Sequence, residues 1–349
     1  MVETTLTINL DALAANYADL NAVSSPTTET AAVVKANAYG TGIERAGPKL
    51  KSAGAKTFFT ATTQEAASLA KVIGPDPRIF VFGGLLYQDF DLFKAQNFIP
   101  LLNSVDHVKA YLAHPNQTGF GLQIDTGMNR LGLEAPDLRE ALNLIGDAKP
   151  ELVISHLACA DTPEHDMNAA QLHEFKRLTD GMNWRRSLAA TGGTLLGASY
   201  HFDLTRPGIG LYGGAPFTNA QPVVHLDIPV IQTRQISAGE NVGYGAAWTA
   251  QRDSRIATIS AGYADGLVRA MGQGKVNLYA GSTPCPLIGR VSMDLLTVDV
   301  TDIENIPDTL SLLNLVQGVD DLAAAAGTIG YEFLTSLGGR YSRRYVGKE

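Results

Sequence analysis

Lys35 stands where an amine could act as a nucleophile. It ends an apolar run, Ala31-Ala32-Val33-Val34, and precedes Ala36-Asn37-Ala38-Tyr39-Gly40. A lysine at the end of a buried strand directs its amine beyond the strand, and partial burial lowers the pKa of an ammonium group. The neutral amine is the form that makes a Schiff base. On these residues alone, a lysine that extends into solvent is the simpler interpretation.

Other reactive side chains end the later strand-like runs. If these runs form a barrel of parallel strands, the carboxyl ends of the strands gather at one rim, where such barrels carry their active sites. The candidates at or just after these ends are Tyr39, Arg130, His156, Thr191, Arg206 and Gly208. With Lys35 they offer an amine, two fixed cations, an imidazole and donors for a phosphate-sized anion.

The segment Gly208-Ile209-Gly210-Leu211-Tyr212-Gly213 has the spacing G-x-G-x-x-G. No amphipathic helix follows it, because Gly214-Ala215-Pro216 breaks the chain, so the context of a dinucleotide fingerprint is missing. Its backbone N–H groups could hold a phosphate, as barrel enzymes do after their last strands. A simple glycine turn explains the segment equally well.

A metal site is not expected. The candidate ligands His156, Asp161, His165 and His173 match no zinc spacing, and no paired cysteines join them.

Three loops late in the chain place large side chains among glycines. Tyr244 lies between Gly243 and Gly245, and similar loops carry Tyr263 and Met293. An aromatic lid over a core edge and a core-filling methionine are the ordinary structural interpretations.

The elements that must position these residues alternate in type. Amphipathic stretches such as 10–20, 63–72 and 168–178 separate short apolar runs, which indicates parallel strands with helical crossovers. The strand-like runs are 32–36, 57–60, 79–82, 99–102, 120–125, 152–156, 187–190 and 201–205. Eight such units favour a closed TIM-type (β/α)₈ barrel over an open sheet.

The sequence pattern changes after Pro216. Short strands and glycine turns replace the helical periodicity, with strand-like runs at 227–232, 255–260, 276–279, 286–289 and 295–300. This pattern is typical of an all-β domain. The sequence therefore predicts an α/β protein with a (β/α)₈ barrel over 9–222 and a β domain over 223–349, joined by an N-terminal strand, 1–8.

Composition narrows the class of partner and the location. The net charge is −8 among 349 residues, and no basic stripe suggests nucleic acid. The early acidic and polar residues interrupt any leader peptide, and no apolar run is long enough for a membrane span. The only cysteines, Cys159 and Cys285, lie far apart. We expect a cytoplasmic protein with no membrane partner.

Several segments resemble those of alanine racemases, which are fold-type III pyridoxal-phosphate enzymes. The resemblance runs from Asn9-Leu10-Asp11 to Arg340-Tyr341-Ser342-Arg343. Its motifs, in the family's order, are 34–40, 125–132, 155–158, 206–213, 243–248, 262–266 and 289–294. Each motif alone is weakly specific, whereas seven in register are strongly specific.

The resemblance implies a role for each candidate. Lys35 would carry pyridoxal phosphate and act as one acid/base, and Tyr244 from the other subunit of a head-to-tail homodimer would be the opposite base. Two bases on opposite sides of a planar carbanion can remove and return a proton without moving the substrate. Arg206 would face the pyridine nitrogen, and His156 would link Tyr244 to Arg206. The phosphate would be held by Tyr39, Thr191, Gly208 and Ile209, and the substrate by Arg130, Met293 and Tyr263.

The sequence departs from the family pattern at three places. Gln123 stands where many members have a lysine that becomes carbamylated and supports the arginine matching Arg130, and glutamine forms no carbamate. Ala190-Thr191 replaces the more usual Asn-Ser, and Gly339 stands where some members have a tyrosine near the phosphate. These changes affect support of the cofactor rather than the reaction class.

The leading interpretation is a pyridoxal-phosphate alanine racemase (an isomerase) that supplies D-alanine for peptidoglycan. One alternative is a broad-specificity amino-acid racemase or a basic amino-acid decarboxylase of the same fold, although such decarboxylases place a glutamate where Arg206 stands. Another is a non-catalytic pyridoxal-phosphate carrier, which the β domain with Tyr244 argues against.

Overall fold

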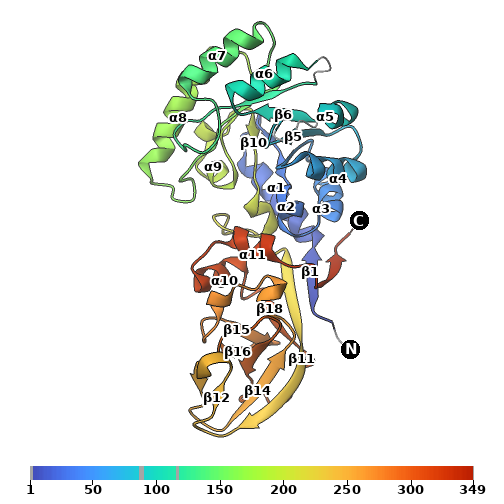
Figure 1. The fold of residues 1–349 in the computed structure, drawn as a ribbon, viewed down its shortest axis with the longest axis vertical. Coiled ribbons are helices and arrows are strands. Elements are labelled where there is room, and N and C mark those ends of the chain that lie inside the picture. Colours follow the sequence, from blue (N-terminus) through green and yellow to red (C-terminus); the bar gives the residue numbers. More distant parts are fainter. Residues whose placement is uncertain (1–2, 86–89, 115–117, 349) are drawn as a thin grey trace. The chain divides into compact units, whose positions relative to one another are not determined.

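The computed structural model describes residues 3–85, 90–114 and 118–348. It contains two compact units, which we describe separately (Figure 1). One comprises Leu13–Leu211 and Pro216–Ala220, and the other Met1–Ala12, Tyr212–Ala215 and Gln221–Glu349.

The first unit is built on parallel strands that pair in chain order. They are β3 (Ala32–Val33), β4 (Thr57–Thr60), β5 (Arg78–Val81), β6 (Ile99–Leu102), β7 (Gly121–Gln123), β8 (Leu152–Ile154) and β9 (Arg186–Ser187). An eighth, β10 (Leu204–Thr205), pairs in parallel with β2 (Glu29–Thr30), which leads directly into β3. A bridge between Ala190 and Arg206 joins the segments beyond β9 and β10. The strands therefore close on themselves, and the predicted (β/α)₈ barrel is confirmed.

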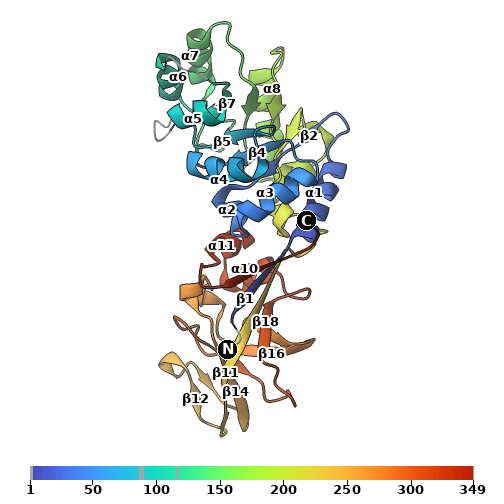
Figure 2. The same ribbon diagram turned by 90° about the vertical axis from the view of Figure 1, so that its right-hand side faces the viewer.

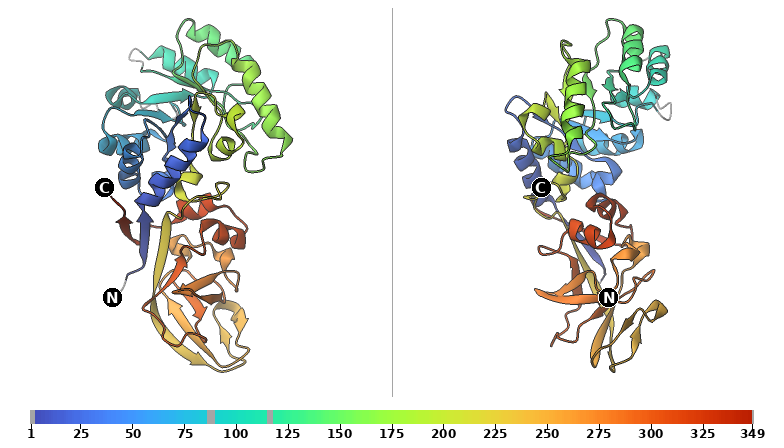
Figure 3. Two further views of the ribbon diagram at one scale, coloured as in Figure 1. Left: turned by 180° about the vertical axis from the view of Figure 1, so that it is seen from behind. Right: turned by 90° about the vertical axis from the view of Figure 1, so that its left-hand side faces the viewer.

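Helices cover the outside of this barrel (Figures 1 and 3). They are α1 (Leu10–Val23), α3 (Ile43–Ser52), α4 (Thr63–Ile73), α5 (Phe90–Gln96), α6 (Val105–Ala113), α7 (Ala135–Ile145) and α8 (Asp166–Thr179). Two short helices, α2 (Lys35–Tyr39) and α9 (Thr191–Leu195), follow β3 and β9. Helix α4 illustrates why they form: it buries Ala66, Leu69 and Ile73 on one face, and its N-terminus has a capping box.

Several strands are shorter than the apolar runs that predicted them, whereas β4 and β6 match their runs. Strand β3 ends at Val33 rather than at Ala36, and β8 ends two residues before His156. The remaining residues of each run form the loops of the rim. The candidate side chains thus lie beyond the strand ends rather than in the strands.

The second unit is mainly β and its central strands also close into a ring. The order is β14 (Ser254–Ile259), β17 (Leu296–Asp299), β16 (Thr283–Ile288), β15 (Asn277–Ala280), β18 (Thr309–Leu313) and β11 (Val224–Ile236), and β11 pairs again with β14. Strand β11 closes the ring because its first part pairs with β18 and its second part pairs with β14. The register of the second pairing shifts between Val230 and Gln232. A small hairpin joins β12 (Asn241–Val242) to β13 (Trp248–Thr249).

The two ends of the chain meet on this unit. Strand β1 (Thr5–Asn9) pairs antiparallel with β11 and parallel with β19 (Ser342–Val346) (Figures 1 and 2). The unit also contains two helices that the pattern of strands and turns did not predict, α10 (Val319–Ala326) and α11 (Gly330–Ser336). The expected β domain is therefore confirmed as mainly, rather than wholly, β.

Candidate active site

Lys35 precedes a turn of left-handed backbone. The four residues Ala36 to Tyr39 have φ between 52° and 54°. The left-handed helical conformation costs an L-residue roughly 1–2 kcal/mol. Such a turn persists only where surrounding contacts hold it, and it is typical of functional sites. One such contact joins the Asn37 Oδ1 to the N–H of Ile43 at 2.8 Å. The turn carries the chain sharply away from β3 and leaves Lys35 at the rim.

The surroundings of Lys35 lower the pKa of its amine. Although part of the side chain reaches solvent, the main cause is desolvation, and the positive charge of Arg130 adds to it, while Glu65 acts in the opposite direction. The Nζ atom lies 5.7 Å from the ring centroid of Phe82. A lowered pKa raises the fraction of neutral amine, which is the nucleophilic form.

Arg206 is a buried cation at the same rim. Only 2% of it is exposed, its Nη2 donates to the Ser155 carbonyl at 2.6 Å, and its Nη1 donates to the Ser187 hydroxyl. Burial lowers the pKa of its guanidinium to about 9. Among the residues that the structure describes, no carboxylate forms an ion pair with it. A buried arginine without a carboxylate can direct its N–H donors at a bound acceptor.

Lys35 and Arg206 each lie over one of two stacked phenylalanine rings. The ring centroids of Phe59 and Phe82 lie 5.1 Å apart. The Arg206 Cζ lies 5.9 Å from the centroid of the Phe59 ring, and the Lys35 Nζ lies over the Phe82 ring. Cation–π contacts of this kind stabilise charged groups on an apolar floor. Sequence reasoning did not select these phenylalanines, although both lie near the ends of strands that it predicted.

His156 is surrounded by positive charge. The pKa of its imidazole is lowered to about 3, mainly by burial and further by the positive charges of Arg206, Arg130 and Lys35. At neutral pH the imidazole is therefore uncharged, and can relay a hydrogen bond without adding a fourth cation. The shared electrostatics show that the structure brings these four predicted residues together.

Thr191 and the loop after β10 form a compact set of donors. The Thr191 hydroxyl accepts from the N–H groups of Gly208 at 3.0 Å and Gly210 at 3.3 Å. Gly208 has to be glycine, because a Cβ there would lie 2.3 Å from the Tyr39 hydroxyl. Ile209, which begins the 3₁₀ turn η2 (Ile209–Tyr212), is 1% exposed. Two hydroxyls and the backbone N–H groups of a buried loop have the chemistry of a phosphate cradle.

Arg130 lies on a loop whose backbone is held by the carboxylate of Asp125. Asp125 accepts from the N–H groups of Gly127 at 2.7 Å and Arg130 at 3.1 Å. Gln123, at the end of β7 and 7% exposed, donates its amide Nε2–H to the carbonyl of Leu131 at 3.0 Å. Gln123 therefore supports this loop through the main chain next to Arg130.

Tyr244 belongs to the second unit, where it begins the 3₁₀ turn η3 (Tyr244–Ala246). It is 70% exposed. Its neighbours Gly243 and Gly245 have φ of 77° and 69°, a conformation that glycine adopts without strain. The guanidinium of Arg290 packs so close to Gly245 that a Cβ there would lie 3.3 Å from it. The interpretation as an aromatic lid over a core edge is therefore wrong, because the ring is not packed down.

Tyr263 and Met293 lie side by side on the same unit. The N–H of Tyr263 donates to the Ser292 carbonyl at 3.0 Å, and the N–H of Ala264 donates to the Met293 carbonyl at 3.0 Å. Both side chains are exposed, Tyr263 by 42% and Met293 by 53%. Met293 is therefore not core filling.

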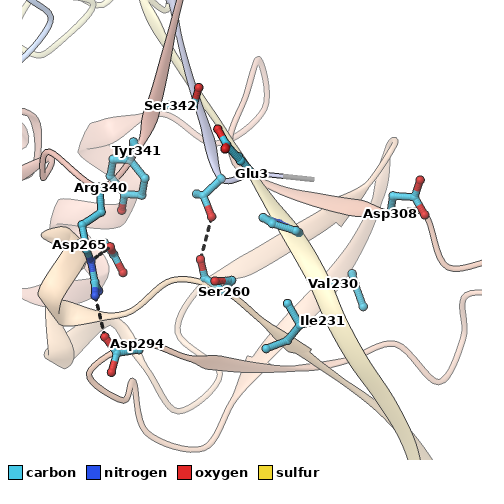
Figure 4. Close-up of a pocket in the computed structure, with 12 residues that line it drawn as sticks. Glu3, Val230, Ile231, Ser260, Asp265, Asp294, Asp308, Arg340, Tyr341 and Ser342 are labelled. Atoms are coloured by element: carbon cyan, nitrogen blue, oxygen red, sulfur yellow. Dashed lines mark hydrogen bonds and ion pairs between the residues drawn. The ribbon is translucent and has the colours of Figure 1, made fainter. Parts of the chain in front are cut away.

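Arg340 fastens the two loops that carry Tyr263 and Met293 (Figure 4). Its Nε donates to Asp265 at 2.6 Å and its Nη1 to Asp294 at 2.8 Å. Arg340, Asp265 and Asp294 line a cavity of about 1000 Å³, together with Tyr341, whose buried hydroxyl has no hydrogen-bond partner among the described residues. Sequence reasoning missed this clamp, because its three members lie far apart in the chain.

Residues 3–85, 90–114 and 118–348 contain neither a metal-binding cluster nor a membrane-spanning helix. Within these ranges no group of three histidine, cysteine or acidic side chains could hold a metal ion. The same ranges contain no helix with the length and apolar character needed to cross a bilayer.

Comparisons with known proteins agree with the geometry of both units. Residues 8–216 match the family model for the alanine racemase N-terminal domain, and residues 223–345 match that for the C-terminal domain. The alanine racemase of Dinoroseobacter shibae is 55% identical over 351 residues, which cover 99% of each chain. That of Rhizobium meliloti is 42% identical and covers 98% of this chain and 96% of its own.

Solved structures show the same fold. Alanine racemase from Bartonella henselae, with covalently bound pyridoxal phosphate, is 35% identical with a TM-score of 0.93 and covers 99% of this chain and 100% of its own. The biosynthetic alanine racemase of Pseudomonas aeruginosa is 34% identical with a TM-score of 0.93 and the same coverage. The chain belongs to the alanine racemase family.

Proposed function

We propose that this protein is a pyridoxal-phosphate-dependent alanine racemase that interconverts L-alanine and D-alanine. The observation that carries the proposal is the arrangement at the barrel rim. An amine with a lowered pKa, Lys35, shares an aromatic floor with the buried cation Arg206, which has no carboxylate partner among the described residues.

The donors of the rim fit the cofactor. Tyr39, Thr191, Gly208 and Ile209 would hold its phosphate, and Lys35 would hold its carbonyl carbon. Pyridoxal phosphate, when bound, supplies a conjugated ring that delocalises negative charge from the substrate α-carbon.

Arg206 would face the ring nitrogen and keep its own proton. With a pKa of about 9, its guanidinium stays charged at neutral pH and leaves no proton for that nitrogen. An unprotonated nitrogen makes the ring a weaker electron sink, which favours rapid return of the α-proton over transamination. The decarboxylase alternative requires a glutamate at this position and is therefore disfavoured.

Two bases on opposite faces of the substrate would carry out racemisation. Lys35 would move a proton at one face of the α-carbon, and Tyr244 of the partner subunit would move it at the other. His156, uncharged at neutral pH, would connect Tyr244 of the partner subunit with Arg206 by hydrogen bonding. Arg130 would orient the cofactor's phenolic oxygen or the substrate carboxylate, on a loop that Gln123 supports.

A homodimer would complete the site. Tyr244, Tyr263 and Met293 are large side chains that this chain leaves exposed together on the second unit. Exposed apolar and aromatic groups of this kind mark interaction surfaces. Residues 9–222 and 223–349 would act as the cofactor domain and the partner-facing domain, with strand 1–8 joining them.

The proposal extends to the location and the pathway. Cys159 and Cys285 are both free thiols, which suits a reducing compartment such as the cytoplasm. D-alanine made there would serve peptidoglycan synthesis.

Borohydride reduction followed by peptide mapping tests the cofactor assignment. We expect the purified protein to absorb in the visible range and the reduced pyridoxyl group to lie on Lys35. In parallel, incubation with L-alanine in heavy water should give D-alanine with deuterium at the α-carbon. A label on another residue, or absence of α-proton exchange, would contradict the proposal.

A further inference from the structure

One carboxylate holds the turn that follows Lys35. Glu65, in the first turn of α4, accepts the N–H of Ala36 through Oε1 at 2.6 Å. Its Oε2 accepts the N–H groups of Ala61 at 2.8 Å and Thr62 at 3.4 Å. Since Ala61 and Thr62 follow β4, a single side chain links the rim beyond β3 to the rim beyond the neighbouring strand.

The hydrogen bond from the Ala36 N–H to Glu65 lies at the start of the left-handed turn. Ala36 is the first of four left-handed residues, and the peptide bond joins its nitrogen to the carbonyl carbon of Lys35. Asn37 secures the far side of the turn through Ile43, whereas Glu65 secures the side next to Lys35. A short hydrogen bond to an ionised carboxylate is stronger than one between neutral groups.

Glu65 also acts on the charge of the amine. The charged groups that influence Lys35 are Arg130, which lowers its pKa, and Glu65, which raises it, while the nearby His156 is neutral. The same carboxylate therefore shapes the backbone at Lys35 and limits how far its pKa falls.

We propose that Glu65 is a positioning residue for Lys35: by holding the Ala36 N–H it keeps the left-handed turn in place and orients the amine toward the cofactor. The inference rests on the proposed role of Lys35. Glu65 itself touches neither the reacting atoms nor the phosphate cradle.

Thr62 provides a matched control. Its hydroxyl caps the same helix by accepting the Glu65 N–H at 3.2 Å, and within the described part of the chain its side chain forms no hydrogen bond with the turn after Lys35. Thr62→Ala therefore weakens the α4 cap while leaving the carboxylate on Ala36. Comparing it with Glu65→Ala separates loss of the cap from loss of the contact with the turn.

The first experiment measures hydrogen exchange and cofactor affinity of the full chain with pyridoxal phosphate. In Glu65→Ala we expect amide exchange of residues 36–40 to accelerate, and the dissociation constant for pyridoxal phosphate to rise by about tenfold or more. In Thr62→Ala both should stay within about twofold of wild type. Equal changes in the two variants would overturn the inference, because a weakened helix end would then explain them.

The second experiment uses Glu65→Gln, which keeps the shape and one acceptor. Removing the negative charge lowers the pKa of Lys35 further, so the pH dependence of its attachment to pyridoxal phosphate should shift toward lower pH. A purely structural role would leave this profile unchanged. An unshifted profile, together with unchanged exchange in Glu65→Ala, would overturn the inference.

The outcomes distinguish this inference from the proposed function. If borohydride labels a residue other than Lys35 in the wild-type protein, the proposed function fails. If Lys35 is labelled in the wild type and equally well in Glu65→Ala at limiting cofactor, only the role of Glu65 fails.

Discussion

The buried part of the barrel rim and the loops of the second unit carry candidate residues in opposite ways. At the rim, Arg206, Thr191 and Tyr39 are at most 4% exposed and are held by hydrogen bonds and close packing. On the second unit, Tyr244 and Met293 are more than half exposed. The residues of the first group are buried and held by contacts within one chain, whereas those of the second group have side chains that this chain does not cover.

Under the proposed function this difference has a physical reason. A phosphate and a charged ring need pre-organised donors, and buried donors must be satisfied and fixed by the fold that surrounds them. A residue that acts across a subunit boundary has to remain exposed until the partner arrives. The backbone can nevertheless be fixed in advance, as the Arg340 clamp between Asp265 and Asp294 shows.

Lys35→Ala should have the largest effect, because it removes both the cofactor attachment and one base. We expect racemisation to fall by more than about 10⁴-fold and the visible absorbance to disappear. Lys109→Ala, at an exposed lysine paired with Glu140, is the control and should retain both. Retained absorbance in Lys35→Ala would show that the rim group is not the cofactor site.

Tyr244→Phe should separate the two regions. Racemisation should fall by roughly 10²–10⁴-fold, while affinity for pyridoxal phosphate and the melting temperature stay nearly unchanged, because the exposed hydroxyl stabilises nothing within its own unit. Tyr331→Phe, also on the second unit and 39% exposed, is the control. Activity within about tenfold of wild type, equivalent to about 1.4 kcal/mol, would exclude Tyr244 as the second base.

Mixed dimers sharpen the same comparison. If each site combines Lys35 of one subunit with Tyr244 of the partner subunit, a hybrid of Lys35→Ala and Tyr244→Phe chains has one intact site. Random mixing should then restore about a quarter of wild-type activity. No recovery would mean that both residues act within one chain.

One pH effect on stability should come from His156 in the barrel. His156 has a folded-state pKa of about 3, below the ordinary value of 6.5, so between these pH values the unfolded chain binds a proton that the folded chain excludes. The free energy of unfolding should therefore fall as the pH drops from 6.5 toward 5, by at most about 1.4 kcal/mol per pH unit from this group. Urea unfolding of His156→Gln should show a shallower dependence, whereas the exposed control His173→Gln should follow wild type. Parallel curves for wild type and His156→Gln would contradict this.

Gln123→Ala should have the smallest effect. It removes one hydrogen bond to Leu131 beside Arg130, which is worth about 1 kcal/mol. We expect KM for alanine to rise by a few fold with little change in cofactor affinity, measured by steady-state kinetics and absorbance. The exposed control Gln251→Ala should change neither. A large loss of cofactor would indicate that Gln123 supports the cradle instead.

Much of the barrel could be predicted because its signals are local. Apolar runs and amphipathic stretches alternate along the chain, and Lys35 and Arg206 immediately follow two of the runs. Helix α10 was missed although its signals are also local: four consecutive alanines, an Asp321 that accepts the Gly318 N–H, and Gly327 in a left-handed C-cap. The β-rich surroundings outweighed them.

The contacts that support the site could not be predicted in this way. Glu65 reaches Ala36 from helix α4, Phe59 stacks on Phe82 across strands, and Arg340 joins loops separated by up to 75 residues from it. Nothing in the local pattern around each residue specifies its distant partner. These contacts form only when each unit has folded and brings the distant segments together.

The sequence by itself determined the order of elements, the residues at the strand ends and the family motifs, because periodicity and residue type are properties of short segments. Only the tertiary structure decided which side chains lie together, how deeply Arg206 and His156 are buried, and that Lys35 leads into a left-handed turn. Burial and its effect on pKa depend on the whole surrounding shell, and neighbours along the chain supply only a small part of that shell.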